Sequence, residues 1–401
     1  MGTGKQANVN TQVLDMDKAL QVLNQQEGSE LFVTVGYPVS IRVNGRIVRL
    51  NKSVLTKKQV EQAILSVMDE PEFHRFCEQM ESNFALDKTE IGRFRVSALY
   101  QKGMPAMVIR RIHMGVPSME KLGLPVSLGN VIMKPRGLIL VVGPAGSGKT
   151  TSMAALLDHR NRQGNGHIIT IEDPVEYVHE HKQCIITQRD VGLDTQNFEV
   201  ALSNTLRQSP DIIAVGEIRN PQIMKYALQY VETGHLCIAT LHANNSYQAL
   251  ERIVHFYPVE QRPQLLMDLS LNMQAIVGQQ LIPSKNQDKP SLATEILLNT
   301  PRIADLMQQG KIDEISSVMK KSQDQGMQTF DQSIYKLYET GIISYEKALL
   351  HATSANDLRL MIKLKGKNTI NTDNDLGLST EDESVECFNR SSVKASKKPK
   401  K

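Results

Sequence analysis

A glycine-rich segment in the second quarter of the chain constrains the fold most strongly. Gly143–Thr150 reads GPAGSGKT and matches G-x-x-x-x-G-K-[ST], a pattern whose glycines let backbone N–H groups surround phosphate oxygens. The apolar run Leu138–Val142 precedes it, and a helical pattern begins at Thr150. A glycine-rich turn that merely starts a helix is the alternative, but both flanks are those that a phosphate-binding loop requires.

The middle of the chain alternates apolar runs with helical patterns. After the first run, further ones span Ile168–Ile171, Ile212–Val215 and Leu236–Leu241. Such alternation predicts a parallel sheet with crossover helices. After about Tyr257 the pattern is mostly helical.

The first third predicts a smaller α+β domain. Asn44-Gly45 separates two β-rich runs, as in a short hairpin whose turn residues need positive φ. Later, Phe94, Val96 and Ala98 alternate with polar residues, which predicts a strand with one buried face. Glycine and proline are frequent before residue 138, as in a connecting segment. We expect an N-terminal domain (1–112), a linker (113–137), a nucleotide-binding domain (138–366) and a disordered tail (367–401).

Composition limits the possible partners. Lys and Arg number 46 against 43 Asp and Glu, but five of the lysines lie within residues 391–401. The rest of the chain carries 41 basic and 43 acidic residues and no tryptophan, so it lacks the basic excess typical of nucleic-acid binders. We therefore expect no nucleic-acid partner. No apolar run approaches the roughly 20 residues that span a bilayer, which favours a cytosolic protein.

Polar residues follow the predicted strands, at the ends where open parallel sheets bind ligands. Glu217 follows one strand, so we expect it to hold Mg²⁺ directly or through water. His242 follows another and is expected near the γ-phosphate. Asp211 and His235 precede their strands instead, which predicts structural or contact roles for them.

A base for an attacking water would have to come from the acidic loop after Ile171. Glu172 and Glu176 are both candidates, and a solvated acidic loop without function is the alternative. In the glycine-rich loop, Lys149 is expected to reach the β- and γ-phosphates and Thr150 to offer its hydroxyl to Mg²⁺. These residues together predict nucleotide hydrolysis.

With these motifs placed, the chain resembles the secretion ATPases of the type II and type IV pilus systems, most closely the pilus retraction ATPases of the PilT and PilU type. The resemblance runs from about residue 10 to residue 365. Its motifs are GPAGSGKTT (Gly143–Thr151), HIITIEDPVEYVH (His167–His179), RQSPDIIAVGEIR (Arg207–Arg219) and ETGHLCIATLHANN (Glu232–Asn245). It implies an α/β protein in which a PAS-like α+β N-terminal domain precedes a RecA-like P-loop ATPase domain with a mostly parallel sheet and a helical C-terminal part. It also implies a homo-hexameric ring.

The resemblance implies roles for individual residues. Glu176 matches the general base and Glu217 the Walker B acid, while Arg95 and Arg110 match N-terminal-domain arginines that reach the bound nucleotide. His242 lies in the histidine-containing motif. ATP and Mg²⁺ are the implied ligands. The whole loop is expected to bind ATP, through Gly143, Pro144, Ala145, Gly146, Ser147, Gly148, Lys149, Thr150 and Thr151.

The implied function is an ATPase motor that drives pilus retraction and twitching motility at the cytoplasmic face of the bacterial inner membrane. The implied partners are a PilT-like motor and an inner-membrane pilus platform protein. HLCIATLHANN and GMQTFDQSIYKLY favour the PilU branch, and RIADLMQQ at Arg302–Gln309 replaces the AIRNLIRE-like segment of PilT-type chains. That replacement argues against retraction by this chain alone.

Two alternatives remain beside this function. One is a nucleotide-binding accessory or scaffold subunit whose own hydrolysis is secondary. The other is a pilus-extension or type II secretion ATPase, disfavoured because the four cysteines, at positions 77, 184, 237 and 387, cannot form the zinc element of those relatives. The tail lysines could add a peripheral contact with an anionic membrane.

Overall fold

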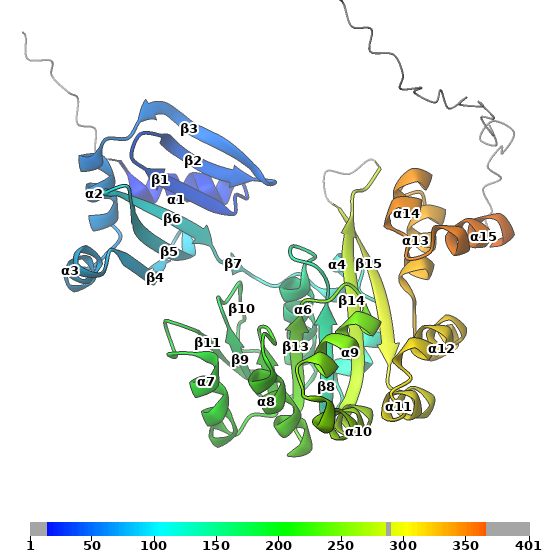
Figure 1. The fold of residues 1–401 in the computed structure, drawn as a ribbon. Helices are drawn as coiled ribbons and strands as arrows, with labels where there is room; N and C mark the ends of the chain where they lie inside the picture. The colour runs from blue at the N-terminus through cyan, green and yellow to red at the C-terminus, as the bar shows by residue number, and fades with distance from the viewer. Residues whose placement is uncertain (1–13, 286–289, 366–401) are drawn as a thin grey trace, which may run out of the picture.

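The computed structural model describes residues 14–285 and 290–365. Figure 1 shows two parts of the chain, with the short strand β7 between them. Within the described residues, no helix is long and apolar enough to cross a membrane. The expected disordered tail at 367–401, with its lysines, lies outside the described residues.

The N-terminal part is an antiparallel sheet with three helices. Its six strands are ordered β3-β2-β1-β6-β5-β4. The helices are α1 (Met16–Gln25), α2 (Lys57–Leu65) and α3 (Glu70–Gln79). The strands are β1 (Glu30–Thr34), β2 (Pro38–Val43), β3 (Arg46–Val54), β4 (Glu81–Lys88), β5 (Gly92–Gln101) and β6 (Met104–Arg111).

Local sequence signals explain these elements. Asn44 and Gly45 both have positive φ, 49° and 76°, in the β2–β3 hairpin, as predicted. On β5, the side chains of Phe94, Val96 and Ala98 are buried in the domain core, which leaves the alternate residues on the other face. On that face, Arg95 reaches acidic residues of the second part.

The second part is built on a sheet of seven strands, ordered β11-β9-β12-β13-β8-β14-β15. All neighbours are parallel except β14 and β15. The sheet therefore confirms the expected α/β fold, with carboxyl ends of the parallel strands on one edge. The strands are β8 (Gly137–Val142), β9 (Gly166–Glu172), β11 (Cys184–Asp190), β12 (Ile212–Val215), β13 (Leu236–Leu241), β14 (Met273–Ile282) and β15 (Ser291–Leu298).

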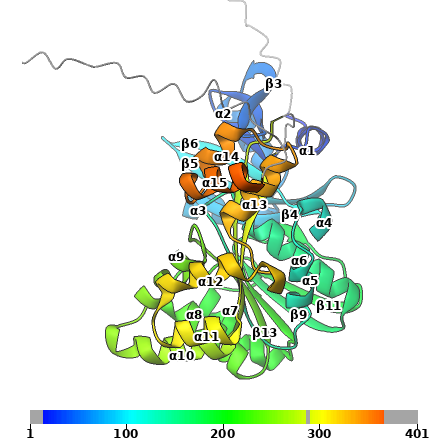
Figure 2. The ribbon, with the colours of Figure 1, turned by 90° about the vertical axis from the view of Figure 1, so that its right-hand side faces the viewer.

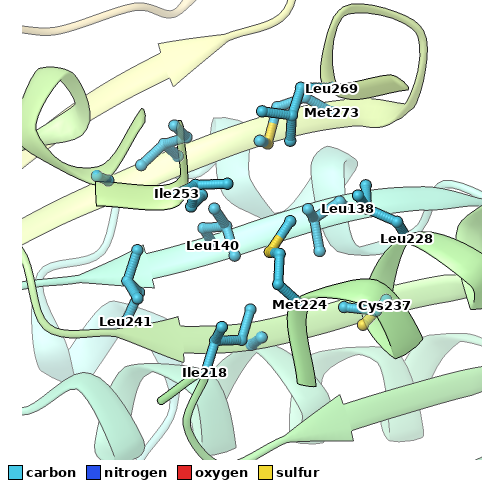
Figure 3. Close-up of a cluster of buried hydrophobic side chains, with 14 of the residues drawn as sticks. Leu138, Leu140, Ile218, Met224, Leu228, Cys237, Leu241, Ile253, Leu269 and Met273 are labelled. Carbon is cyan, nitrogen blue, oxygen red and sulfur yellow. The ribbon is translucent and has the colours of Figure 1, made fainter. Parts of the chain in front are cut away.

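Helices cover both faces of this sheet (Figure 2). On one face, Leu138 and Leu140 of β8 pack in a cluster with Met224 of α8 and Ile253 of α9 (Figure 3). On the other face, Val141 packs with residues of α4, α5 and α6. The helices are α4 (Met119–Leu122), α5 (Ser127–Ile132), α6 (Lys149–Gln163), α7 (Phe198–Thr205), α8 (Pro221–Glu232), α9 (Ser246–His255), α10 (Arg262–Asn272), α11 (Pro301–Gln308) and α12 (Ile315–Lys321).

The region after Tyr257 is mostly helical, as predicted, but it also contains two long strands, β14 and β15, that the sequence pattern does not predict. Residues 273–282 (MQAIVGQQLI) form a short apolar run, and periodicity alone does not separate such a buried strand from a buried helix. The strand lies between β8 and β15, where both of its faces are covered. The remaining helices, α13 (Phe330–Glu339), α14 (Tyr345–His351) and α15 (Ala355–Lys365), pack on the far end of this pair.

The segment between the two sheets has structure of its own. Strand β7 (His113–Met114) pairs in parallel with β10 (Tyr177–Val178), which follows β9 in the second part. Beyond it, Met119 of α4 and Leu128 of α5 are buried against the seven-stranded sheet. Residues 119–132 therefore pack with the second part, while β7 lies between the two sheets and pairs with the second part through β10. The domain boundaries themselves stay a prediction.

Candidate functional site

The glycine-rich loop leaves β8 and enters α6 at Lys149. Gly146 and Gly148 have φ of +73° and +85°, a region that residues with a Cβ rarely adopt. A Cβ on Gly143 would lie 2.4 Å from Ser147 Oγ and 2.5 Å from the Gln279 carbonyl oxygen. Ser147 Oγ is itself buried without a hydrogen-bond partner among the described residues. The loop thus has the close, backbone-lined geometry that a phosphate group fits.

Gln279 of β14 contacts this loop through a side-chain hydrogen bond. Its side chain is fully buried, and its Nε2 donates a hydrogen bond of 2.7 Å to the carbonyl of Ser147. Gln279 is not among the residues predicted from the sequence, because the pattern does not predict the strand that carries it. The run holds three glutamines, at positions 274, 279 and 280, and its sequence does not show that Gln279 is the buried one.

Lys149 is the first residue of α6 and lies against the loop. Its Nζ donates to the carbonyls of Gly143 (3.0 Å) and Pro144 (2.9 Å). Burial lowers the pKa of Lys149, while the negative charges of Glu217 and Glu176 oppose that shift. The same three charged groups line a cavity of about 220 Å³ together with Thr150. The structure therefore brings the predicted lysine, hydroxyl and two carboxylates to one site.

The ends of β12 and β13 contribute Glu217 and His242. Glu217 Oε1 lies 3.1 Å from Nε2 of His242, and His242 Nδ1 lies 3.3 Å from Nζ of Lys149. Glu217 Oε2 also accepts a hydrogen bond of 2.8 Å from Nε of Arg219. Two of the side chains predicted at the strand ends are thus in direct contact with each other.

Glu172, the last residue of β9, is not on a solvated loop. It is 5% exposed, and it accepts a hydrogen bond of 2.7 Å from the hydroxyl of Thr170. Desolvation by burial raises the pKa of Glu172 to about 7. The carboxyl therefore titrates near neutrality inside the wall of the cavity.

Glu176 lies four residues further along, between two cavities. It lines the cavity at the glycine-rich loop, and it also lines a second one of about 330 Å³ between the two domains. Tyr177 beside it stacks on His113 of the linker, and its hydroxyl lies 3.1 Å from Oγ1 of Thr151. The half-buried Glu176 is thus placed to meet a ligand that occupies both cavities.

Arg95 and Arg110 enter from the N-terminal sheet, where they lie directly opposite each other on β5 and β6. Both line the cavity between the domains. The side chain of Arg95 is only 21% exposed, and its NH1 lies 3.1 Å from Oδ1 of Asp190. Arg110 is 51% exposed and bonds weakly to Glu30 at 3.4 Å. Arg95 is the less exposed of the two because it pairs with Asp190 and Asp173 of the second domain, whereas Arg110 pairs with Glu30 of its own sheet.

An ion-pair chain that sequence reasoning missed connects the two domains. Asp173 lies 3.9 Å from Arg95 and 3.1 Å from Arg219, which in turn pairs with Glu217. The signal that could have found this chain is the position of two acids at strand ends: Asp173 directly follows β9, and Asp190 is the last residue of β11. Strand β11 was not predicted, so the second acid had no assigned place.

Two other residues lie at the opposite edge of the sheet. Asp211 precedes β12, and its Oδ2 accepts a hydrogen bond of 2.7 Å from the backbone N–H of His167. His235 precedes β13 and lies 3.0 Å from the hydroxyl of Thr233. Neither residue lines the two cavities described above.

The donor atoms suit a magnesium ion that is shared with a phosphate ligand. Within the described residues, no group of three or more His, Cys, Asp or Glu side chains could hold a metal by itself. Mg²⁺ is commonly bound by one or two protein oxygens together with substrate phosphates. The hydroxyl of Thr150 and the carboxylate of Glu217 line one cavity and supply such oxygens.

Comparisons of the sequence and of the structure with known proteins all point to one family. The chain is 52% identical over 351 residues to the type IV pilus ATPase PilU of Pseudomonas aeruginosa, which covers 88% of this chain and 92% of that one. It is 38% identical to PilT of the same organism, over 84% of this chain and 97% of PilT. The crystal structure of the pilus retraction motor PilT with bound ADP matches with a TM-score of 0.80 at 35% identity, over 87% of this chain and all of that one. The model of the "Type II/IV secretion system protein" family matches residues 7–380, and the chain belongs to that family.

Proposed function

We propose that this chain is an ATP-hydrolysing motor of the type IV pilus machinery and acts in pilus retraction. The observation that carries the proposal is the phosphate-binding loop after β8, which faces the carboxylates of Glu217 and Glu176 across one cavity. The similarity to PilU and PilT over most of the chain supports the same function.

The loop from Gly143 to Thr151 binds the phosphates of ATP. Its backbone N–H groups and the N-terminus of α6 attract negative charge, and Lys149 gives up its contacts with the loop carbonyls to bind phosphate oxygens. Thr150 and Glu217 hold Mg²⁺, directly or through water. The ion offsets the negative charge of the phosphates.

The opposite wall of the site supplies the groups for hydrolysis. Glu176 accepts the proton of the attacking water, because it is the half-buried carboxylate that faces both cavities. Arg95 and Arg110 bind the phosphates from the N-terminal domain and stabilise the charge of the transition state. His242, in contact with Lys149 and Glu217, lies beside the terminal phosphate.

The assembly is a homo-hexamer that works beside a PilT-like motor and a pilus platform protein of the inner membrane, at its cytoplasmic face. The basic tail would add a peripheral contact with the membrane. The higher identity to PilU than to PilT, 52% against 38%, favours a second function as an accessory of the PilT-like motor.

Gene deletion tests the cellular role. Cells that lack this gene, its PilT-like paralogue or both are compared for retraction, and Lys149→Ala is used for complementation. Loss of retraction in the single deletion that Lys149→Ala does not restore would support the motor. Full restoration by Lys149→Ala would instead support the accessory function, and unchanged retraction in every strain would refute both.

A further inference from the structure

The segment that carries Glu176 is extended and forms no strand of the seven-stranded sheet. Its β10 portion, Tyr177–Val178, pairs only with β7 of the linker among the described strands. It runs beside β11, which is an edge strand of that sheet. What fixes the segment to the ATPase domain therefore determines where Glu176 lies.

Side chains of β11 take the place of a backbone partner. Asp190 Oδ2 accepts a hydrogen bond of 3.1 Å from the backbone N–H of Val175. Gln188 Nε2 donates 2.9 Å to the carbonyl of Tyr177, and Gln188 Oε1 accepts 2.8 Å from the N–H of His179. Gln188 and Asp190 are two residues apart on the strand, so their side chains share one face. Together they bind every second residue of the segment.

The other edge of the segment belongs to the linker. The carbonyl of Glu176 accepts a hydrogen bond of 3.0 Å from the backbone N–H of His113, in register with the β7–β10 pair. In an extended segment the backbone groups of alternate residues point to opposite edges. The backbone groups of Val175, Tyr177 and His179 therefore point toward β11. The backbone carbonyl of Glu176 points toward β7, the strand between the two domains.

We propose that Gln188 is a positioning residue for Glu176. Its amide bridges Tyr177 and His179 and sets the register of the segment, with Asp190 holding the neighbouring turn. Because β7 binds the opposite edge, a displacement of the N-terminal domain is transmitted to Glu176 through the linker and resisted by Gln188. The proposal rests on the proposed function, since Glu176 has its role as base there.

The size of the effect follows from the geometry of general-base catalysis. A base must lie within hydrogen-bond distance of the proton that it accepts. A displacement of about 1 Å can slow a reaction by about 10²-fold without a change in the ground-state contacts of the substrate. Removal of the Gln188 amide should therefore lower kcat rather than raise KM.

Gln188→Met in the full chain tests the inference, with Gln183→Met as the matched control. Gln183 is exposed just before β11, so its side chain bears none of these contacts. We expect Gln188→Met to lower kcat at least about tenfold, with the KM for ATP within about twofold and a melting temperature lower by only a few degrees, because hydrogen bonds to Tyr177 and His179 are lost. Hydrogen exchange at the His179 amide should become faster. Gln183→Met should match the wild type in all four measurements.

Two results would overturn the inference. One is a wild-type kcat in Gln188→Met, whatever its exchange rates. The other is an unchanged exchange rate at His179, which would show that Gln188 does not hold the segment. The exchange measurement needs no enzymatic activity, so it decides this point even if the wild type hydrolyses no ATP, a result that would refute the proposed function instead.

Discussion

The two walls of the site are held by different kinds of contact. The wall formed by the glycine-rich loop is one continuous segment between β8 and α6, fixed by glycine geometry and by the buried Gln279. The opposite wall combines β5, the linker and residues 172–190, and it is held by ion pairs such as Arg95–Asp190. The first wall is built into the sheet, whereas the second joins two domains.

This difference indicates which wall binds ATP in a fixed geometry and which wall changes its geometry when ATP is bound. Backbone geometry inside a packed sheet resists displacement, because any shift would disturb the core. Ion pairs that are partly exposed contribute little to stability and exchange partners readily. We therefore expect the loop wall to bind ATP in every state, and the domain-spanning wall to arrange itself around the bound nucleotide.

The largest effect is expected from the loop wall. Lys149→Ala should lower ATP hydrolysis by about 10³-fold or more, because the positive charge beside the phosphates is lost. The fold should remain intact, since Lys149 bonds only to loop carbonyls and His242 in this structure. Steady-state turnover and the melting temperature of the same sample measure both points. Unchanged turnover would refute the assignment of the loop.

The domain-spanning wall is tested by Arg95→Ala, for which we expect turnover to fall by about 10³-fold. The melting temperature should fall by only a few degrees, because the lost contact lies between domains. Arg93→Ala is the matched control, because Arg93 lies on the same strand but pairs with Asp87 of its own domain, whose side chain is 70% exposed. Turnover that falls equally in both variants would indicate a general disturbance of β5.

The buried carboxyl of Glu172 sharpens the comparison through pH. Its pKa is raised from 4.5 to about 7. Between these two pH values the folded state therefore retains a proton on Glu172 that the unfolded state has lost. The stability that this proton provides is present below pH 4.5 and is lost as the pH rises through 7. Relative to Glu172→Gln, the wild type should lose about 2 to 4 kcal/mol of unfolding free energy between pH 4.5 and pH 8. Urea unfolding at both pH values measures this, and parallel curves would contradict it.

The smallest effect is expected at the opposite edge of the sheet. Asp211→Ala removes the acceptor for the N–H of His167 and should cost about 1 kcal/mol of unfolding free energy. Its turnover should equal that of the wild type. An inactive but stable Asp211→Ala variant would show that an acid before β12, rather than Glu217 after it, serves the site.

How far the sequence predicts this molecule depends on the same contrast. The glycine-rich loop, the parallel sheet and the strand-end positions of Glu217 and His242 follow from contiguous patterns. The Arg95–Asp190 pair joins residues that are 95 positions apart, and Gln279 bonds to Ser147 across 132 positions. No local pattern encodes such distances. Strands β11 and β14 were not predicted for a related reason. Their own residues show no clear strand periodicity, and it is their pairing with neighbouring strands that makes them part of the sheet.

ATP binding and single-turnover hydrolysis, measured together for the wild type, Lys149→Ala and Glu176→Gln, test the central claim most directly. Glu176→Gln should bind ATP as tightly as the wild type and hydrolyse it at least about a hundredfold more slowly. Lys149→Ala should lose binding as well as hydrolysis. Glu176→Gln with wild-type hydrolysis, or with binding as weak as that of Lys149→Ala, would contradict a site in which one wall binds the nucleotide and the other acts on it.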